Sequence, residues 1–198
     1  MRKIRTIGLL VFVGLAASVA AIYGQERTTF TGSALIYGSG MNTRTVTRTF
    51  TLRVNGRTTA AEVAEYLKTL ESSGQEGLRN AISKNDLGQF SLGSSVGRPL
   101  NAVVVDTFEG KTRVRAVFER WIGFGELRGG YRSVDYPFGY VEIVIDPKTG
   151  KGDGTFIPAA QIRFKHGKAG AADTVEIEDF GTFPGRLLGV RMSGFKIS

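Results

Sequence analysis

The chain has 198 residues with 26 basic and 18 acidic side chains, a net charge of +8 with histidine neutral. It contains no cysteine and a single histidine. This composition excludes a disulfide framework, a thiolate metal site and a cysteine nucleophile, and any Ser-His-Asp triad or histidine-rich metal site would depend on His166 alone.

The first 24 residues have the pattern of a secretory signal peptide. Three basic residues precede an uncharged, mostly apolar run over 7–22. Val19 and Ala21 have the spacing that a signal peptidase requires, and a cut before Gln25 is the alternative. A run of 16 residues is short for a membrane span, which needs about 20. We therefore expect cleavage, a secreted or periplasmic location, and membrane contact only through the signal peptide.

The remaining part, 25–198, is predicted to form one domain. Three of the basic residues lie in the signal peptide, so this part has 23 basic and 18 acidic residues, a net charge of +5. The basic residues are scattered and form no block of like charge, so we expect no nucleic-acid partner. A basic surface suits either simple solubility or an anionic envelope surface.

Two strands are predicted over 27–54. Polar and apolar residues alternate over 44–54, which is typical of a half-buried strand, and Asn55-Gly56 then favours a turn. Thr59-Ala60-Ala61-Glu62 is a capping-box pattern that predicts a helix start. Apolar residues at helical spacing, with a second cap pattern at 73–76, predict two helices that form one hairpin at about 59–84.

From Asp86 onward the pattern is strand and turn. Tight turns at Glu109-Gly110 and at 147–152 predict antiparallel hairpins. The fold class expected is therefore mainly β (α+β), either an antiparallel barrel or a two-sheet sandwich, with one inserted helical hairpin. The strands are expected near 87–93, 100–108, 111–122, 136–146, 153–165, 172–179 and 186–195.

Most motif-like segments have structural interpretations. The glycine-rich stretch at 150–155 has the wrong order and spacing for a phosphate-binding loop, and a strand rather than a helix is predicted after it. Asp146 and Asp153 are too few for a calcium loop. His166 is expected in an exposed turn. We therefore predict no metal and no cofactor.

The segment 119–142 is the strongest candidate for a functional site, because it combines the only tryptophan with tyrosines, carboxylates and arginines. Aromatic rings beside paired carboxylates are typical of glycoside hydrolases, and Glu126 and Asp135 would be that pair. Alternatively, the aromatic rings fold back onto the core and arginine–carboxylate pairs fix the segment. The ligand-binding candidates are Trp121, Arg128, Tyr131, Arg132, Tyr136 and Tyr140.

Several stretches of the C-terminal third resemble a pattern found in secreted bacterial proteins that have no assigned activity. The matching stretches are Arg132-Ser-Val-Asp-Tyr-Pro-Phe138, Gly152-Asp-Gly-Thr155, Pro158-Ala-Ala160 and Ile177-Glu-Asp-Phe-Gly-Thr-Phe-Pro184 with Arg186-Leu187. The resemblance implies a secreted bacterial protein and supplies no catalytic residues.

Three functional hypotheses follow. The preferred one is a non-catalytic extracytoplasmic binding or structural protein, which as a barrel would hold a small apolar ligand in its mouth. The second is a secreted glycan hydrolase that uses Glu126 and Asp135. The third is a basic protein that associates with anionic lipid or polysaccharide.

Overall fold

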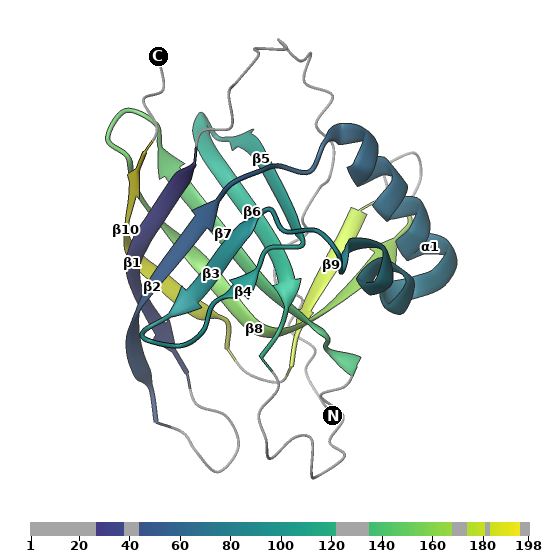
Figure 1. Ribbon diagram of the computed structural model, residues 1–198, viewed down its shortest axis with the longest axis horizontal. Helices are drawn as coiled ribbons and strands as arrows, with labels where there is room; N and C mark the ends of the chain where they lie inside the picture. The colour runs from purple at the N-terminus through teal and green to yellow at the C-terminus, as the bar shows by residue number, and fades with distance from the viewer. Residues whose placement is uncertain (1–26, 38–43, 122–134, 168–173, 181–182, 195–198) are drawn as a thin grey trace.

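The computed structural model describes residues 27–37, 44–121, 135–167, 174–180 and 183–194, so the predicted signal peptide lies outside the described residues. In this part, ten strands form one antiparallel sheet that curls into a half-barrel, and a helix packs on its outer face (Figure 1). The strand order is β4-β3-β2-β1-β10-β8-β7-β6-β5, and β9 pairs with β8. The strands are β1 (Thr28–Ile36), β2 (Val46–Val54), β3 (Gly88–Leu92), β4 (Arg98–Pro99), β5 (Ala102–Phe108), β6 (Lys111–Glu119), β7 (Phe138–Asp146), β8 (Lys151–Lys165), β9 (Thr174–Asp179) and β10 (Gly185–Ser193).

The predicted hairpins are present. The turn at Glu109 and Gly110 joins β5 to β6, with Phe108 opposite Lys111. The turn at 147–150 joins β7 to β8, with Asp146 opposite Lys151. The glycine-rich stretch at 150–155 therefore ends a turn and begins a strand, as expected from its sequence.

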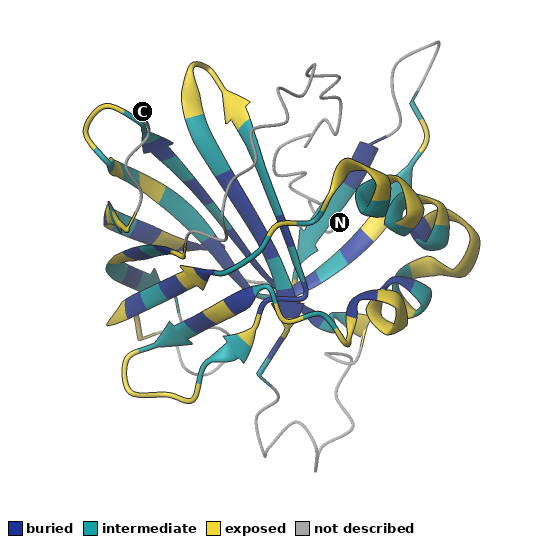
Figure 2. Cartoon of the chain, turned by 45° about the horizontal axis from the view of Figure 1, so that its top comes forward, coloured by how far each residue is buried: buried dark blue, intermediate teal, exposed yellow. Residues whose placement is uncertain are grey.

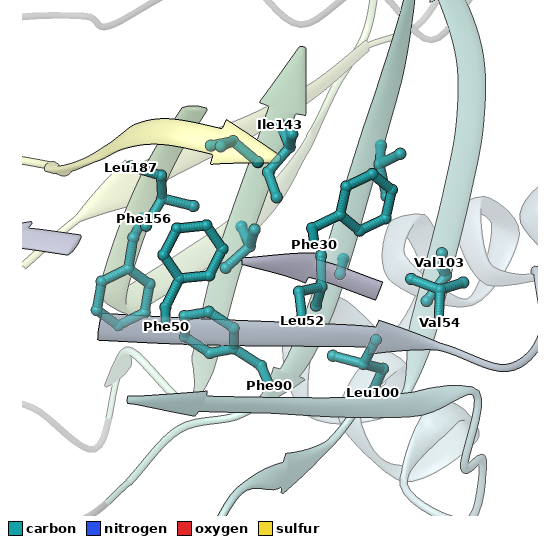
Figure 3. Close-up of a cluster of buried hydrophobic side chains, with 14 of the residues drawn as sticks. Phe30, Phe50, Leu52, Val54, Phe90, Leu100, Val103, Ile143, Phe156 and Leu187 are labelled. Atoms are coloured by element: carbon teal, nitrogen blue, oxygen red, sulfur yellow. The ribbon is translucent and has the colours of Figure 1, made fainter. Parts of the chain in front are cut away.

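The half-barrel encloses a core of phenylalanine and branched aliphatic side chains. The alternation in β2 directs Phe50, Leu52 and Val54 into this core, where they are 2%, 0% and 6% exposed. Figure 3 shows how side chains from strands distant in sequence, such as Phe90 and Phe156, meet there. Because one curled sheet encloses the core, the barrel alternative describes the fold and the two-sheet sandwich does not.

The helix α1 (Ala60–Ile82) begins at the predicted capping box. The backbone N–H of Thr59 donates to Glu62 at 2.7 Å, and the N–H of Glu62 donates to the Thr59 hydroxyl at 3.2 Å. The predicted hairpin is present as one element with a sharp bend at Gly74, whose φ of 64° is a conformation that glycine adopts readily (Figure 2).

The apolar stripe of α1 covers the outer face of β7, β8 and β9. Leu70, Leu78 and Ile82 of the helix are buried, while the opposite side of α1 is exposed (Figure 2). They form a second buried cluster, separate from the barrel interior, with Phe138, Tyr140, Ile157, Ala160, Ile162 and Val175. The sheet therefore buries apolar side chains on both faces at this side of the molecule.

Asn101 fixes the connection between β4 and β5, the two ends of the strand order. Its backbone N–H donates to the carbonyl of Val117 at 2.8 Å. Its side-chain amide donates to the carbonyl oxygens of Ser83 and Asn85, and its Oδ1 accepts from the N–H of Glu119. The short strand β4 and this connection were not predicted, because nothing in the local pattern distinguishes a structural asparagine from a loop residue.

Candidate functional site

The described residues divide the candidate segment 119–142 into two parts. Trp121, Asp135, Tyr136 and Tyr140 are described, whereas Glu126, Arg128, Tyr131 and Arg132 lie outside the described residues. The separation of the Glu126 and Asp135 carboxylates is therefore not described, and the hydrolase pair stays a prediction.

Trp121 packs on the open end of the barrel core. Its ring lies 5.6 Å from that of Phe118 and 6.0 Å from that of Phe90, measured between centroids. Its indole N–H donates to the carbonyl of Val96 at 3.2 Å, and the Arg98 guanidinium lies 6.0 Å from the ring centroid. These contacts hold the indole against the core.

Tyr140 lies beneath α1 and is 4% exposed. Its hydroxyl donates to the Glu142 carboxylate at 2.9 Å. Burial raises the pKa of Tyr140 well above its usual value, and the nearby charge of Glu142 adds to this effect. The residue therefore remains a neutral hydrogen-bond donor at physiological pH, suited to holding a carboxylate rather than to accepting a proton.

A cluster of charged side chains lies beside Glu142 on the outer face of β5 and β6. Asp106 accepts from Arg113 at 2.7 Å and from Arg115 at 2.6 Å. Arg115 stands opposite Glu142 in the sheet register and is only 4% exposed. A buried guanidinium needs a carboxylate near it, so we interpret Asp106 as the counter-charge that makes this position tolerable.

The pKa values within this cluster follow the same physics. Partial burial of Asp106 opposes its ionisation, but the hydrogen bond from Arg113 and the positive charges of both arginines outweigh it and lower the pKa of the carboxyl. Burial lowers the pKa of Arg115, while the charge of Asp106 opposes that change. The cluster thus contains a firmly ionised carboxylate that is engaged by arginines.

Tyr136 links the start of β7 to β9. Its hydroxyl donates to Glu178 at 3.2 Å, and Arg163 approaches the same carboxylate at 3.3 Å. Its ring packs edge-to-face on Phe180 with centroids 5.0 Å apart. Burial, followed by the charge of Glu178, raises the pKa of Tyr136. This arrangement places an aromatic pair at the surface, next to an ion pair.

Asp135 is exposed, and the structure shows its backbone in a contact with the helix. The Gln75 side-chain amide donates to the Asp135 carbonyl at 2.7 Å. Gln75 is the residue directly after the bend at Gly74, so the bend helps to position its side-chain amide. It fixes the backbone that leads into β7.

The interior of the half-barrel is filled by side chains. The Phe90 ring lies 5.3 Å from that of Phe118 and 5.2 Å from that of Phe156, and all three are at most 1% exposed. A hollow of about 440 Å³ lies at the β7–β8 turn beside β10, and another of about 410 Å³ lies between the bend of α1 and β8. Both are outside the barrel interior, and the sequence had predicted an apolar ligand in the mouth of the barrel.

His166 follows the end of β8 and is exposed, as expected. Its Nε2 lies 3.6 Å from the Glu71 carboxylate on α1, and its ring packs on Phe164. Among the described residues, no group of three or more histidine, aspartate or glutamate side chains could hold a metal ion. No helix in the described ranges is long and apolar enough to cross a membrane.

Comparisons with known proteins found no matching family model, no matching curated protein and no matching solved structure.

Sequence reasoning missed two groups that the fold assembles. One is the cluster of Asp106 with Arg113 and Arg115, for which the alternation of charged and apolar residues in 111–118 was the available signal. The other is a set of exposed aromatic residues that includes Phe180 and Phe183, 40% and 67% exposed. Nothing in the sequence indicated that these rings would remain at the surface.

Proposed function

We propose that this chain is an exported, non-catalytic binding protein that works outside the cytoplasm and contacts its partner through its outer surface. The observation that carries the proposal is the filled interior of the half-barrel, where the largest aromatic side chains pack on one another. A barrel that encloses a ligand needs a cavity among these side chains. Because the interior is filled, binding would occur on the outer surface of the protein.

The environment of three carboxylates supports a binding role over hydrolysis. Asp106 is held by two arginines, Glu142 by Tyr140, and Glu178 by a tyrosine and an arginine. A general acid at neutral pH requires a raised pKa, whereas the pKa of Asp106 is lowered. These carboxylates have the partners that a structural role requires.

Export is tested by the mass of the protein that a bacterial host secretes, because cleavage removes the signal peptide. We expect intact-mass spectrometry to find a chain that begins between residues 22 and 25, in the fraction outside the cytoplasm. A matched variant in which Ala21 is replaced by a bulky residue should alter or slow the cleavage. Recovery of the complete chain in the cytoplasm would refute the export part of the proposal.

The non-catalytic part is tested separately with Glu126→Gln and Asp135→Asn, which keep side-chain size and remove the carboxylates. We expect both variants to bind cell-envelope material as the unaltered protein does. Glycan hydrolysis by the unaltered protein that disappears in both variants would instead establish the hydrolase hypothesis.

A further inference from the structure

Two pairs of aromatic side chains come from chain segments at one end of the half-barrel, where β1 and β9 end and β2 and β10 begin; these strand ends are at the bottom of Figure 1. They form two edge-to-face pairs, Tyr37 with Phe183 at 6.2 Å and Tyr136 with Phe180 at 5.0 Å between centroids. Phe180 and Phe183 are three residues apart, so their Cα atoms are at most about 11 Å apart. We call these four residues the aromatic corner.

The aromatic corner exposes apolar surface that the fold could have buried. Phe183 is 67% exposed and Phe180 is 40% exposed. Val46, 38% exposed, begins β2 opposite Ile36, the residue before Tyr37. Single exposed apolar residues need no explanation, but several at one end of a molecule indicate an interaction surface.

Positive charge lies beside the Tyr37–Phe183 pair of the aromatic corner, whereas the Tyr136–Phe180 pair lies beside Asp135 and Glu178. Arg186 is the second residue of β10 and lies three positions after Phe183 in the sequence. It is exposed and pairs with Leu35, near the end of β1. Arg44 and Arg48 are exposed at the start of β2. Aromatic side chains flanked by basic ones match the boundary between water and the acyl region of an anionic bilayer, where rings sit at headgroup depth and arginines contact phosphates.

The shape of this end favours a bilayer over a soluble sugar. The hollow at the β7–β8 turn and the hollow beside the bend of α1 include no residue of the aromatic corner. A sugar is bound by enclosing it between rings and polar groups, whereas a membrane is bound by a part of the protein that projects into it. The rings here stand edge-to-face, and the two phenylalanines are exposed, which suits insertion.

We propose that the aromatic corner docks the protein onto an anionic lipid bilayer, with its rings in the interface and the adjacent arginines on lipid phosphates. This inference rests on the proposed export, because it requires the chain to meet the outer side of a membrane. It adds a membrane contact by the folded part to the one that the sequence predicts for the signal peptide.

The test is co-sedimentation of the protein, as the host delivers it, with vesicles of phosphatidylcholine mixed with phosphatidylglycerol. We expect Phe180→Ser combined with Phe183→Ser to weaken binding by at least about tenfold. Arg186→Gln should weaken it by roughly fivefold at low salt, and binding should fall on vesicles of phosphatidylcholine alone.

Phe108→Ser is the matched control. Phe108 is 41% exposed, nearly the same as Phe180, but it lies at the β5–β6 turn at the opposite end of the barrel (Figure 1). We expect this variant to bind vesicles as the unaltered protein does. Circular dichroism of all variants checks that each is folded.

Three results of the vesicle assay itself would overturn the inference. They are equal loss of binding in the Phe108 control, undiminished binding by the folded double variant, and no binding of the unaltered protein to the mixed vesicles. Competition by a soluble anionic polysaccharide that depends on the same rings would also overturn it in favour of a glycan. Failure of export alone would show in the cleavage assay while the vesicle result stands, so the two failures are distinguishable.

Discussion

A methyl group at position 139 should disrupt the barrel core, because Gly139 lies directly over a phenylalanine ring. Gly139 is opposite Phe118 in the β6–β7 register. A Cβ atom on Gly139 would stand 2.2 Å from Cε2 and 2.4 Å from Cζ of that ring. Ordinary carbon contacts are about 3.5–4.0 Å, so the ring or the strand would have to move by more than about 1 Å.

The ring has little freedom to move. Phe118 is 0% exposed and packs on Phe90 and Trp121, with centroids 5.3 and 5.6 Å away. Overpacking a rigid core costs about 1–3 kcal/mol, and we expect Gly139→Ala to lower the free energy of unfolding by an amount at the upper end of this range.

A double-mutant cycle separates this clash from a backbone effect. Phe118→Ala alone should cost about 3–5 kcal/mol, because it leaves a cavity. In the double variant the new methyl enters that cavity, so we expect the total loss to be smaller than the sum by about 1–3 kcal/mol. Urea unfolding, followed by circular dichroism and by the fluorescence of the single tryptophan, measures all four free energies.

Gly56→Ala is the control for adding a methyl group. Its Cβ would stand 3.0 Å from Cδ2 of Leu87, the end of a flexible side chain, and 4.0 Å from the Cα and Cβ atoms of the same residue. We expect a change below about 1 kcal/mol. An additive cycle, or a Gly139→Ala protein as stable as the unaltered one, would refute the packing argument.

Three further changes test other contacts. Removing one partner of a fully buried ion pair costs about 3–5 kcal/mol. Asp106 is only partly buried, so Asp106→Asn should destabilise the protein by less than this. Because the folded pKa of Asp106 is lowered, the stabilisation by its carboxylate is present above about pH 4 and is lost as the pH falls through the folded pKa. The free energy of unfolding of the variant, measured in urea, should therefore fall less on acidification than that of the unaltered protein. Asn101→Ala should cost about 2–3 kcal/mol, since its side chain serves three backbone groups; an unchanged urea midpoint would contradict this. Thr59→Ala should cost about 1 kcal/mol, and circular dichroism should report the frayed helix, whereas Thr59→Ser should keep the cap.

The local sequence pattern determined most of the secondary-structure elements of this protein. Alternation of apolar and polar residues predicted β2 and most other strands, the capping box at Thr59 predicted the helix start, and turn residues predicted the hairpins. These features depend on residues close in sequence, since side-chain direction repeats every two residues in a strand and a cap bonds within one turn. The composition alone excluded disulfides and cysteine chemistry.

Only the tertiary structure decided how the elements assemble and which candidate residues meet. One sheet rather than two follows from the pairing of β1 with β10, whose partners are more than 150 residues apart. Tyr136 meets Glu178 because β7 and β9 both pair with β8. The exposure of Phe183 likewise depends on what covers it. Such contacts are set by register and curvature across the whole sheet, and a local sequence pattern contains no record of them.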